Sequence, residues 1–314
     1  MKRAIFTTLL CTLALASFAQ SYPAKPIRLV VGFSAGGSAD ISARLFAKRM
    51  GELMKTTIVI ENRGGAGGSY ATQIVADSNA DGYTLLWGNV GPLTVNPALG
   101  MKLGYDVEKD FAPIGLAMTF ANALITRSDF PANSLAGVMA LAKEKPGQIN
   151  YAMQGVGSAG NLAGELWRML TGIRLNAVGY KGAGEIVTSL IGGDVQLAFT
   201  STTAARSMTS ARIKPLAVTS TKRDPALPNV PTFVEQGVAN YDATFWYALL
   251  TQSKVPPAVI ARLNREMQSV LSEPDIVSSL EAQGLIAAPS SPQILRDTIR
   301  ADFAKWKSVL ATSR

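Results

Sequence analysis

Short runs of apolar residues alternate along this chain with segments in which apolar positions recur every three or four residues. The first run, residues 27–31, is rich in β-branched side chains and ends at a glycine, which predicts a buried strand. In the next segment, apolar side chains between residues 41 and 50 share one helical face, opposite Arg44, Lys48 and Arg49. This spacing predicts an amphipathic helix, for which Ser38 is the expected N-cap.

The alternation continues through the rest of the chain. It predicts further strands over residues 57–61, 83–87, 150–153, 175–178, 195–199, 214–219 and 245–251, and further helices over residues 70–79, 135–145, 161–170, 185–191, 257–271 and 291–312. Strands that alternate with helices predict an α/β fold of parallel sheets with helices on both faces. Residues 111–127 are a long, mostly apolar and partly extended stretch, so we expect them to pass between two domains.

Two glycine-rich turns, residues 32–40 and 154–159, share one order of features. Each follows an apolar run and ends in a serine at the start of a helix. Such a turn presents backbone N–H groups and the positive end of the helix dipole to an anion. We therefore predict that two domains aim these turns at one small acid. The alternative for each turn is that its glycines only reverse the chain, and that alternative is at least as good for a third turn, residues 64–68.

The N-terminus predicts export. Lys2 and Arg3 precede an apolar stretch over residues 4–16, and small residues occupy Ser17 and Ala19 before Gln20. This order is typical of a secretory signal peptide cleaved after residue 19. The alternative, a membrane anchor, needs about 20 apolar residues, and this stretch is shorter.

Composition narrows the chemistry further. Cys11, the single cysteine of the chain, lies in the predicted signal peptide, and the chain has no histidine. These absences exclude disulfides, a thiol nucleophile, Cys-based metal sites and the Ser-His-Asp triad in the mature chain, and they remove most zinc sites. Cleavage leaves 295 residues, a length typical of two domains, and lowers the net charge from +8 to +6 because no acidic residue leaves with Lys2 and Arg3. The basic residues are scattered, so nucleic-acid binding is not expected.

Several short segments, taken in their order and spacing, resemble the Bug or TctC-like family, the periplasmic solute-binding proteins of tripartite tricarboxylate transporters. They are residues 22–28, 32–40, 61–68, 81–86, 96–99, 180–182, 192–195, 216–218 and 227–232. The resemblance covers essentially the whole mature chain. It implies a two-lobed, hinge-closing type II periplasmic-binding fold (a Venus flytrap), in which each lobe is a mostly parallel sheet flanked by helices.

The resemblance also implies how the chain is divided. Residues 1–19 are the signal peptide, residues 20–122 together with residues 226–314 form lobe 1, and residues 123–225 form lobe 2. The chain is expected to cross between the lobes near residues 121–124 and again near residues 223–244.

In function, the resemblance implies a periplasmic receptor that captures a small organic acid between the lobes and delivers it to a two-component membrane permease. It implies a monomer without enzyme activity, cofactor or metal, in which backbone groups, hydroxyls and bridging waters hold the acid. Carried over position by position, the ligand contacts fall on Phe33, Ser34, Ala35, Ser38 and Asp40 in lobe 1, and on Gln154, Gly155, Gly157, Ser158, Ala159, Tyr180 and Lys181 in lobe 2. Residues 88–94 depart from the family pattern because they lack a histidine and one hydroxyl, which leaves Asn89 as the main polar side chain there.

Some of these positions have two interpretations. Phe33 is either a wall of the pocket or a core residue. Asp40 either stabilises the N-terminus of its own helix or binds the ammonium group of an amino-acid ligand. Lys181 either contacts the acid or is a solvated turn lysine. Trp246 is expected in the core or the hinge rather than in the pocket.

Two other functions compete with the receptor. An exported α/β enzyme acting on a small anionic substrate is suggested by residues 32–37, which loosely resemble a dinucleotide-binding turn, but their spacing is not Gly-x-Gly-x-x-Gly. The effector half of a transcription regulator can use the same two-lobed fold. The predicted signal peptide and the absence of a DNA-binding segment argue against it.

Overall fold

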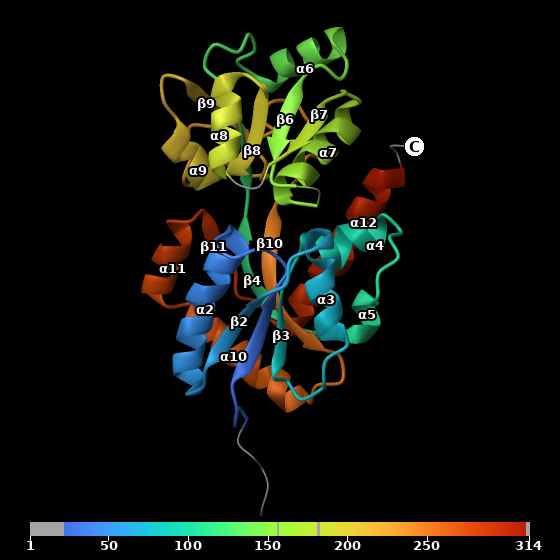
Figure 1. Ribbon diagram of the computed structural model, residues 1–314, viewed down its shortest axis with the longest axis vertical. Coiled ribbons are helices and arrows are strands. Elements are labelled where there is room, and N and C mark those ends of the chain that lie inside the picture. The colour runs from blue at the N-terminus through green and yellow to red at the C-terminus, as the bar shows by residue number, and fades with distance from the viewer. Residues whose placement is uncertain (1–21, 156, 181–182, 312–314) are drawn as a thin grey trace, which may run out of the picture.

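The computed structural model describes residues 22–155, 157–180 and 183–311, which form two lobes joined at a narrow waist (Figure 1). The predicted signal peptide and Lys181 lie outside the described residues. Strands and helices alternate in both lobes, as the sequence pattern predicts, and the α/β two-lobed class is confirmed. Among the described helices, none combines the length and the apolar character that crossing a membrane requires.

Lobe 1, the lower lobe in Figure 1, is a six-stranded sheet with helices on both faces. In chain order its elements are β1 (Ile27–Val31), α2 (Ser38–Met54), β2 (Ile58–Asn62), a 3-10 turn (Ala66–Gly68), α3 (Ser69–Ala76), β3 (Thr84–Asn89), a π-helical turn (Gly91–Val95), α4 (Asn96–Ala98), α5 (Val107–Asp110), β4 (Phe111–Phe120), β10 (Phe245–Gln252), α10 (Pro257–Leu271), α11 (Pro274–Glu281), β11 (Leu285–Ala287) and α12 (Pro292–Ala311). The strand order is β11-β4-β10-β3-β1-β2. Helices α2 and α10 share one apolar core with the sheet, and α3 and α12 share another.

Lobe 2, the upper lobe, is a five-stranded sheet in the order β7-β6-β8-β5-β9. Its elements are β5 (Asn122–Arg127), α6 (Leu135–Glu144), β6 (Asn150–Met153), α7 (Ala159–Thr171), β7 (Asn176–Gly179), α8 (Ala183–Gly192), β8 (Leu197–Ser201), α9 (Thr202–Met208) and β9 (Ile213–Val218). The helix α7 ends where Gly172 takes a left-handed conformation, with φ of 69°.

Both sheets are mixed rather than mostly parallel. In lobe 1, β2, β1 and β3 are parallel neighbours, as are β7, β6 and β8 in lobe 2. The strands that directly follow the two crossings, β5 and β10, run antiparallel to both of their neighbours. A strand whose connection comes from the other lobe is not bound by the helical crossover that makes sequential strands parallel.

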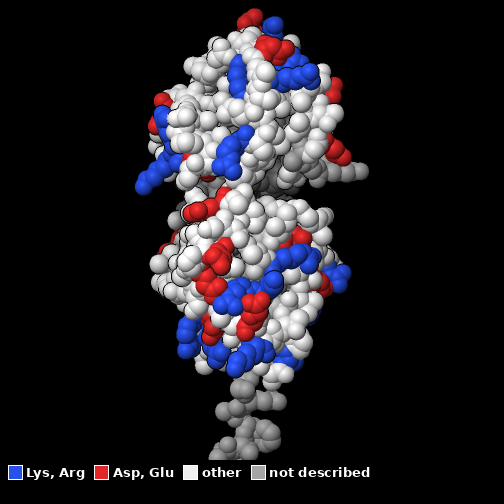
Figure 2. Space-filling view, turned by 90° about the vertical axis from the view of Figure 1, so that its left-hand side faces the viewer, with Lys and Arg blue, Asp and Glu red and all other residues white. Residues whose placement is uncertain are grey.

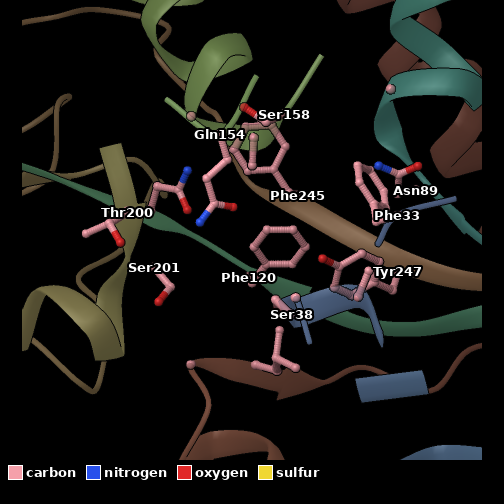
Figure 3. Close-up of a pocket in the computed structure, with 18 of the residues that line it drawn as sticks. Phe33, Ser38, Asn89, Phe120, Gln154, Ser158, Thr200, Ser201, Phe245 and Tyr247 are labelled. Carbon is pink, nitrogen blue, oxygen red and sulfur yellow. The ribbon is translucent and has the colours of Figure 1, made fainter. Parts of the chain in front are cut away.

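We propose that the first crossing between the lobes lies at Ala121. The extended stretch divides into β4 and β5, which belong to different sheets and are separated by Ala121 alone. The chain therefore continues directly from β4 in one lobe to β5 in the other, and Phe120, the aromatic residue at the end of β4, lines the space between the lobes (Figure 3).

The return crossing comes late in the expected stretch. Thr232 forms a parallel bridge with Val218 of β9, and the Phe233 ring lies 4.0 Å from that of Tyr241 and 5.3 Å from that of Trp167 of α7. The segment before β10 thus packs on lobe 2. We therefore propose a division of the lobes near residue 244 rather than at residue 225.

Helix α12 braces this crossing from lobe 1. Asp302 accepts a 2.7 Å hydrogen bond from the indole nitrogen of Trp246, at the start of β10, and Lys305 donates a 3.0 Å hydrogen bond to the backbone oxygen of Asp242. The helix also contacts α7 of lobe 2. Trp246 is thus buried beside the crossing with its polar atom satisfied, as expected of a core or hinge residue, but it also lines the cavity between the lobes, which the sequence interpretation did not expect.

Candidate functional site

A cavity of about 680 Å³ lies between the two lobes. Figure 2 shows a hollow at the waist, with Lys, Arg, Asp and Glu spread over the surfaces of both lobes around it. Residues from both lobes line the cavity, and Figure 3 labels ten of them: Phe33, Ser38, Asn89, Phe120, Gln154, Ser158, Thr200, Ser201, Phe245 and Tyr247. The carboxyl ends of β1, β3, β6 and β8 all meet this space, which is where α/β sheets bind ligands.

The first glycine turn is held in shape by Asp40. Gly36 has φ of 84°, which glycine adopts without strain, and its N–H donates a 2.9 Å hydrogen bond to the Asp40 carboxylate. The side-chain amide of Asn62, in β2, donates a second hydrogen bond of 2.9 Å to the same carboxylate, and Arg44 forms an ion pair with it at 2.9 Å. Burial by itself would raise the pKa of Asp40, but these hydrogen bonds outweigh it and hold the pKa below its usual value.

The N-terminus of α2 is open toward the cavity. The N-cap is Gly37 rather than Ser38, because the helix begins one residue earlier than the sequence pattern predicts, and no side chain caps it. The first N–H groups of an α-helix have no partner within the helix. Since Gly37, Ser38 and Ala39 all line the cavity, backbone donors and the positive end of the dipole lie at its wall.

The second glycine turn repeats this arrangement in lobe 2. Gly157 has φ of 80°, and its N–H donates a 3.0 Å hydrogen bond to the side-chain oxygen of Asn161, four residues on, as Gly36 does to Asp40. Ser158 is the N-cap of α7, and its hydroxyl accepts a 3.3 Å hydrogen bond from the Asn161 N–H. The anchor in lobe 2 is a neutral amide, whereas lobe 1 uses a carboxylate neutralised by Arg44.

The structure brings nine of the thirteen predicted site residues to the cavity. They are Phe33, Ser34, Ala35, Ser38, Asn89, Gln154, Gly157, Ser158 and Ala159. Asp40, Gly155 and Tyr180 are not among the described residues that line it, and Lys181 lies outside the described residues. Asp40 is turned back onto its own loop, and Tyr180 packs against the core of lobe 2.

The sequence interpretation missed an aromatic floor. The Phe120 ring lies 4.9 Å from that of Tyr247 and 5.7 Å from that of Phe245, and the Tyr247 ring is stacked 6.1 Å from that of Trp87. Burial raises the pKa of the Tyr247 phenol to about 12, and a hydrogen bond with Ser38 partly offsets the effect, so this group stays neutral. These residues lie on β3, β4 and β10, which are far apart in sequence but adjacent in the sheet.

A pair of hydroxyl residues in lobe 2 was also missed. Thr200 and Ser201 end β8 and line the cavity, and the Ser201 hydroxyl caps α9 by accepting a 3.3 Å hydrogen bond from the Ala204 N–H. The signal was present in the sequence as a strand followed by a serine-capped helix. It lacks the glycines of the other two turns, which is why it did not stand out.

The lining carries no formal charge over the part of the chain that is described. None of the cavity residues in that part is Asp, Glu, Lys or Arg, and its polar side chains are hydroxyls, amides, an indole and the Tyr247 phenol. The described residues also contain no group of three or more potential metal ligands. Whatever binds here is held by hydrogen bonds, helix ends and ring faces.

The lobes touch directly beside the cavity, through glycines. A carbon attached to Gly91 in ideal Cβ geometry would lie 3.4 Å from the carbonyl oxygens of both Gly157 and Gly67. One attached to Gly157 would lie 3.5 Å from the Gly67 Cα. The third glycine turn, residues 64–68, therefore meets the second one across the cleft, although it is not among the described residues that line the cavity.

Comparisons with known proteins agree with this geometry. The model of a family described as the tripartite tricarboxylate transporter family receptor matches residues 42–313. The chain is 33% identical to BugT of Bordetella pertussis, over 93% of this chain and 90% of that protein. A structure of Rpa4515 of R. palustris with adipate superposes with a TM-score of 0.83 at 32% identity, over 93% of this chain and 98% of that one. A structure of MatC from Rhodopseudomonas palustris with bound malate superposes with a TM-score of 0.82 at 28% identity, over 92% of this chain and 99% of that one.

Proposed function

Since the chain belongs to the family of tripartite tricarboxylate transporter receptors, we propose that it is a periplasmic solute-binding receptor that captures a small carboxylate in the cleft between its lobes and hands it to the membrane permease of such a transporter. Export by the predicted signal peptide, a monomeric state and water-bridged contacts to the acid are parts of the same proposal. The adipate and malate of the two related structures support the carboxylate class.

One observation carries the proposal. The two glycine turns lie on different lobes, are each held by a side-chain oxygen four residues farther along the chain, and present two helix N-termini to one uncharged cavity. Each N-terminus contributes about 0.3–1 kcal/mol to binding an anion, and up to about 2 kcal/mol when partly buried. With several hydrogen bonds added, this is enough for micromolar binding, which corresponds to about −8 kcal/mol.

Binding drives closure because only the closed form offers both helix ends to one ligand. An acid bound to one lobe alone gains half of these contacts. The bound acid therefore favours the closed state by the binding free energy of the contacts with the other lobe. The closed lobes then present to the permease a surface that the open form lacks. The enzyme alternative has no support from a particular observation, since the chain contains no histidine and the residues at the cavity are neutral hydrogen-bonding groups and rings.

Thermal unfolding of the refolded mature protein tests the proposal. We expect at least one of adipate, malate, citrate, benzoate and 3-phenylpropanoate, at about 100 times its dissociation constant, to add roughly 2.7 kcal/mol of stability. The neutral amides of the same acids should give no shift. If no acid shifts the transition, or if the amides act equally well, the carboxylate proposal is wrong.

A matched pair of variants locates the site. Ala159 is the first residue of α7 and lines the cavity, whereas Ala261 lies on the exposed surface of α10. Ala159→Leu should abolish the ligand-dependent shift because the larger side chain fills the cavity at the helix end, without removing the Ser158 cap. Ala261→Leu should leave the shift unchanged. Equal behaviour of the two variants would place the ligand elsewhere.

A further inference from the structure

The cleft has two chemically different parts. The glycine turns supply N–H groups and hydroxyls at its walls, while β4 and β10 supply a floor of aromatic rings. In Figure 3 the rings of Phe120 and Phe245 lie in the middle of the view, the amide of Gln154 points toward them, and Ser38 lies on the other side. A ligand whose carboxylate lies at the helix ends therefore has these rings within the same cavity, where they can contact the rest of the ligand.

The floor is rigid and has one accessible ring. Tyr247 and Phe245 are buried, and the stack continues from Tyr247 to Trp87 in the core of lobe 1. Phe120 stacks on Tyr247 with an interplanar angle of 23° but is only half-buried, so part of its ring remains open. Rings locked in this way present a flat surface without losing side-chain freedom when a ligand arrives.

The floor is a poor place for a second negative charge. No charged side chain lines the cavity in the described part of the chain, and burial keeps the Tyr247 phenol neutral. A carboxylate placed on the rings would lose its hydration without gaining a cation, which is unfavourable. An aromatic body there gains ring contacts and loses only apolar hydration.

From this arrangement we propose that the receptor is selective for monocarboxylates with an aromatic body, whose carboxylate binds at the two glycine turns and whose ring lies on Phe120. The cavity, at about 680 Å³, is in the range of small-molecule sites and leaves room for a body larger than a short-chain acid. This inference rests on the proposed function, since it specifies the acid that the same site binds.

Calorimetric titration of the mature protein with benzoate, 3-phenylpropanoate, adipate, malate and citrate tests the selectivity. The aromatic acids should bind at least about tenfold more tightly than the aliphatic di- and tricarboxylates, because the latter bury a second charge. If adipate, malate or citrate binds as tightly as the better aromatic acid, the inference fails while the carboxylate receptor stands. If none of the five acids binds, both fail.

Variants of one ring separate contact with the ligand from loss of packing. Phe120→Leu should lower the affinity for 3-phenylpropanoate by roughly threefold to tenfold and change the affinity for adipate little. Phe120→Tyr keeps the ring, so it should retain the preference for the aromatic acid. The control is Phe130→Leu, at a half-buried phenylalanine of lobe 2 that is not among the described cavity residues. If Phe120→Leu weakens both acids equally, or acts no differently from Phe130→Leu, the ring does not select the ligand and the inference is wrong.

Discussion

Replacing Gly91 with alanine adds a single methyl group, which should weaken closure of the lobes without destabilising the fold. Gly91 lies at the start of the π-helical turn after β3, without a positive φ, so alanine fits its backbone. Replacing glycine at such a position stabilises a protein by about 0.4–1 kcal/mol, because it restricts the unfolded chain. In the open form Gly157 has moved away, and the Gly67 carbonyl oxygen of the same lobe still lies 3.4 Å from the added carbon. This contact offsets the gain, so Gly91→Ala should be close to neutral in the open form.

In the described structure, where the lobes approach each other at the glycines, the same methyl group meets the second lobe. It would lie 3.4 Å from the carbonyl oxygen of Gly157 in lobe 2, closer than a methyl group normally sits, so the lobes must separate by a few tenths of an ångström. Such overpacking costs about 1–3 kcal/mol. Because 1.4 kcal/mol is a factor of ten, we expect the dissociation constant of the bound acid to rise about fivefold to a hundredfold.

Calorimetric titration and ligand-free thermal unfolding measure the two effects separately. The control is Gly192→Ala, at the exposed last residue of α8, where the added carbon would approach only the Asp194 carboxylate, at 3.7 Å. This control should leave the affinity unchanged. The reasoning is refuted if Gly91→Ala binds the acid as tightly as the wild type, or if it loses stability without ligand.

Two further predictions concern charge. Asp40→Asn should lower the free energy of unfolding by about 1–3 kcal/mol at pH 7, because hydrogen bonds to the charged carboxylate become neutral ones. Because the folded pKa of Asp40 is depressed, its stabilisation is present above the unfolded pKa of about 3.9 and is lost as the pH falls through the folded value. Urea titrations of the two proteins should therefore converge below about pH 4, and a constant gap would contradict the assignment. Ligand affinity should be flat between pH 6 and pH 9, since the chain has no histidine and the pKa of Tyr247 is about 12. A calorimetric pH profile with a slope near neutrality would show that another titrating group takes part.

The local sequence was enough to predict most of the helices and strands and the two glycine turns. The apolar run of β1, the glycines after it and the periodicity of α2 are contiguous in the chain, so their structure depends on near neighbours. The second turn followed the same rule, and Ser158 caps its helix as the pattern predicts. The start of α2 shifted by one residue because Gly37, with φ of −82° and ψ of 169°, takes the N-cap conformation itself.

The parts that the sequence did not predict depend on contacts between distant residues. The aromatic floor exists because β10 inserts between β3 and β4, which brings Tyr247 beside Phe120, and no local pattern encodes that insertion. Asp40 lies at the correct loop, yet Asn62 and Arg44 turn its carboxylate away from the cavity. The segment before β10 is held on lobe 2 by ring contacts of Phe233, which a pattern of prolines and turns does not reveal.

A crystal structure of the refolded protein with bound 3-phenylpropanoate tests the central claim most directly. We predict both carboxylate oxygens within hydrogen-bonding distance of N–H groups or hydroxyls from residues 34–39 and from residues 157–159, directly or through one water, with the lobes closed. A carboxylate that contacts only one of these two turns, or that lies outside the cleft, would contradict the account.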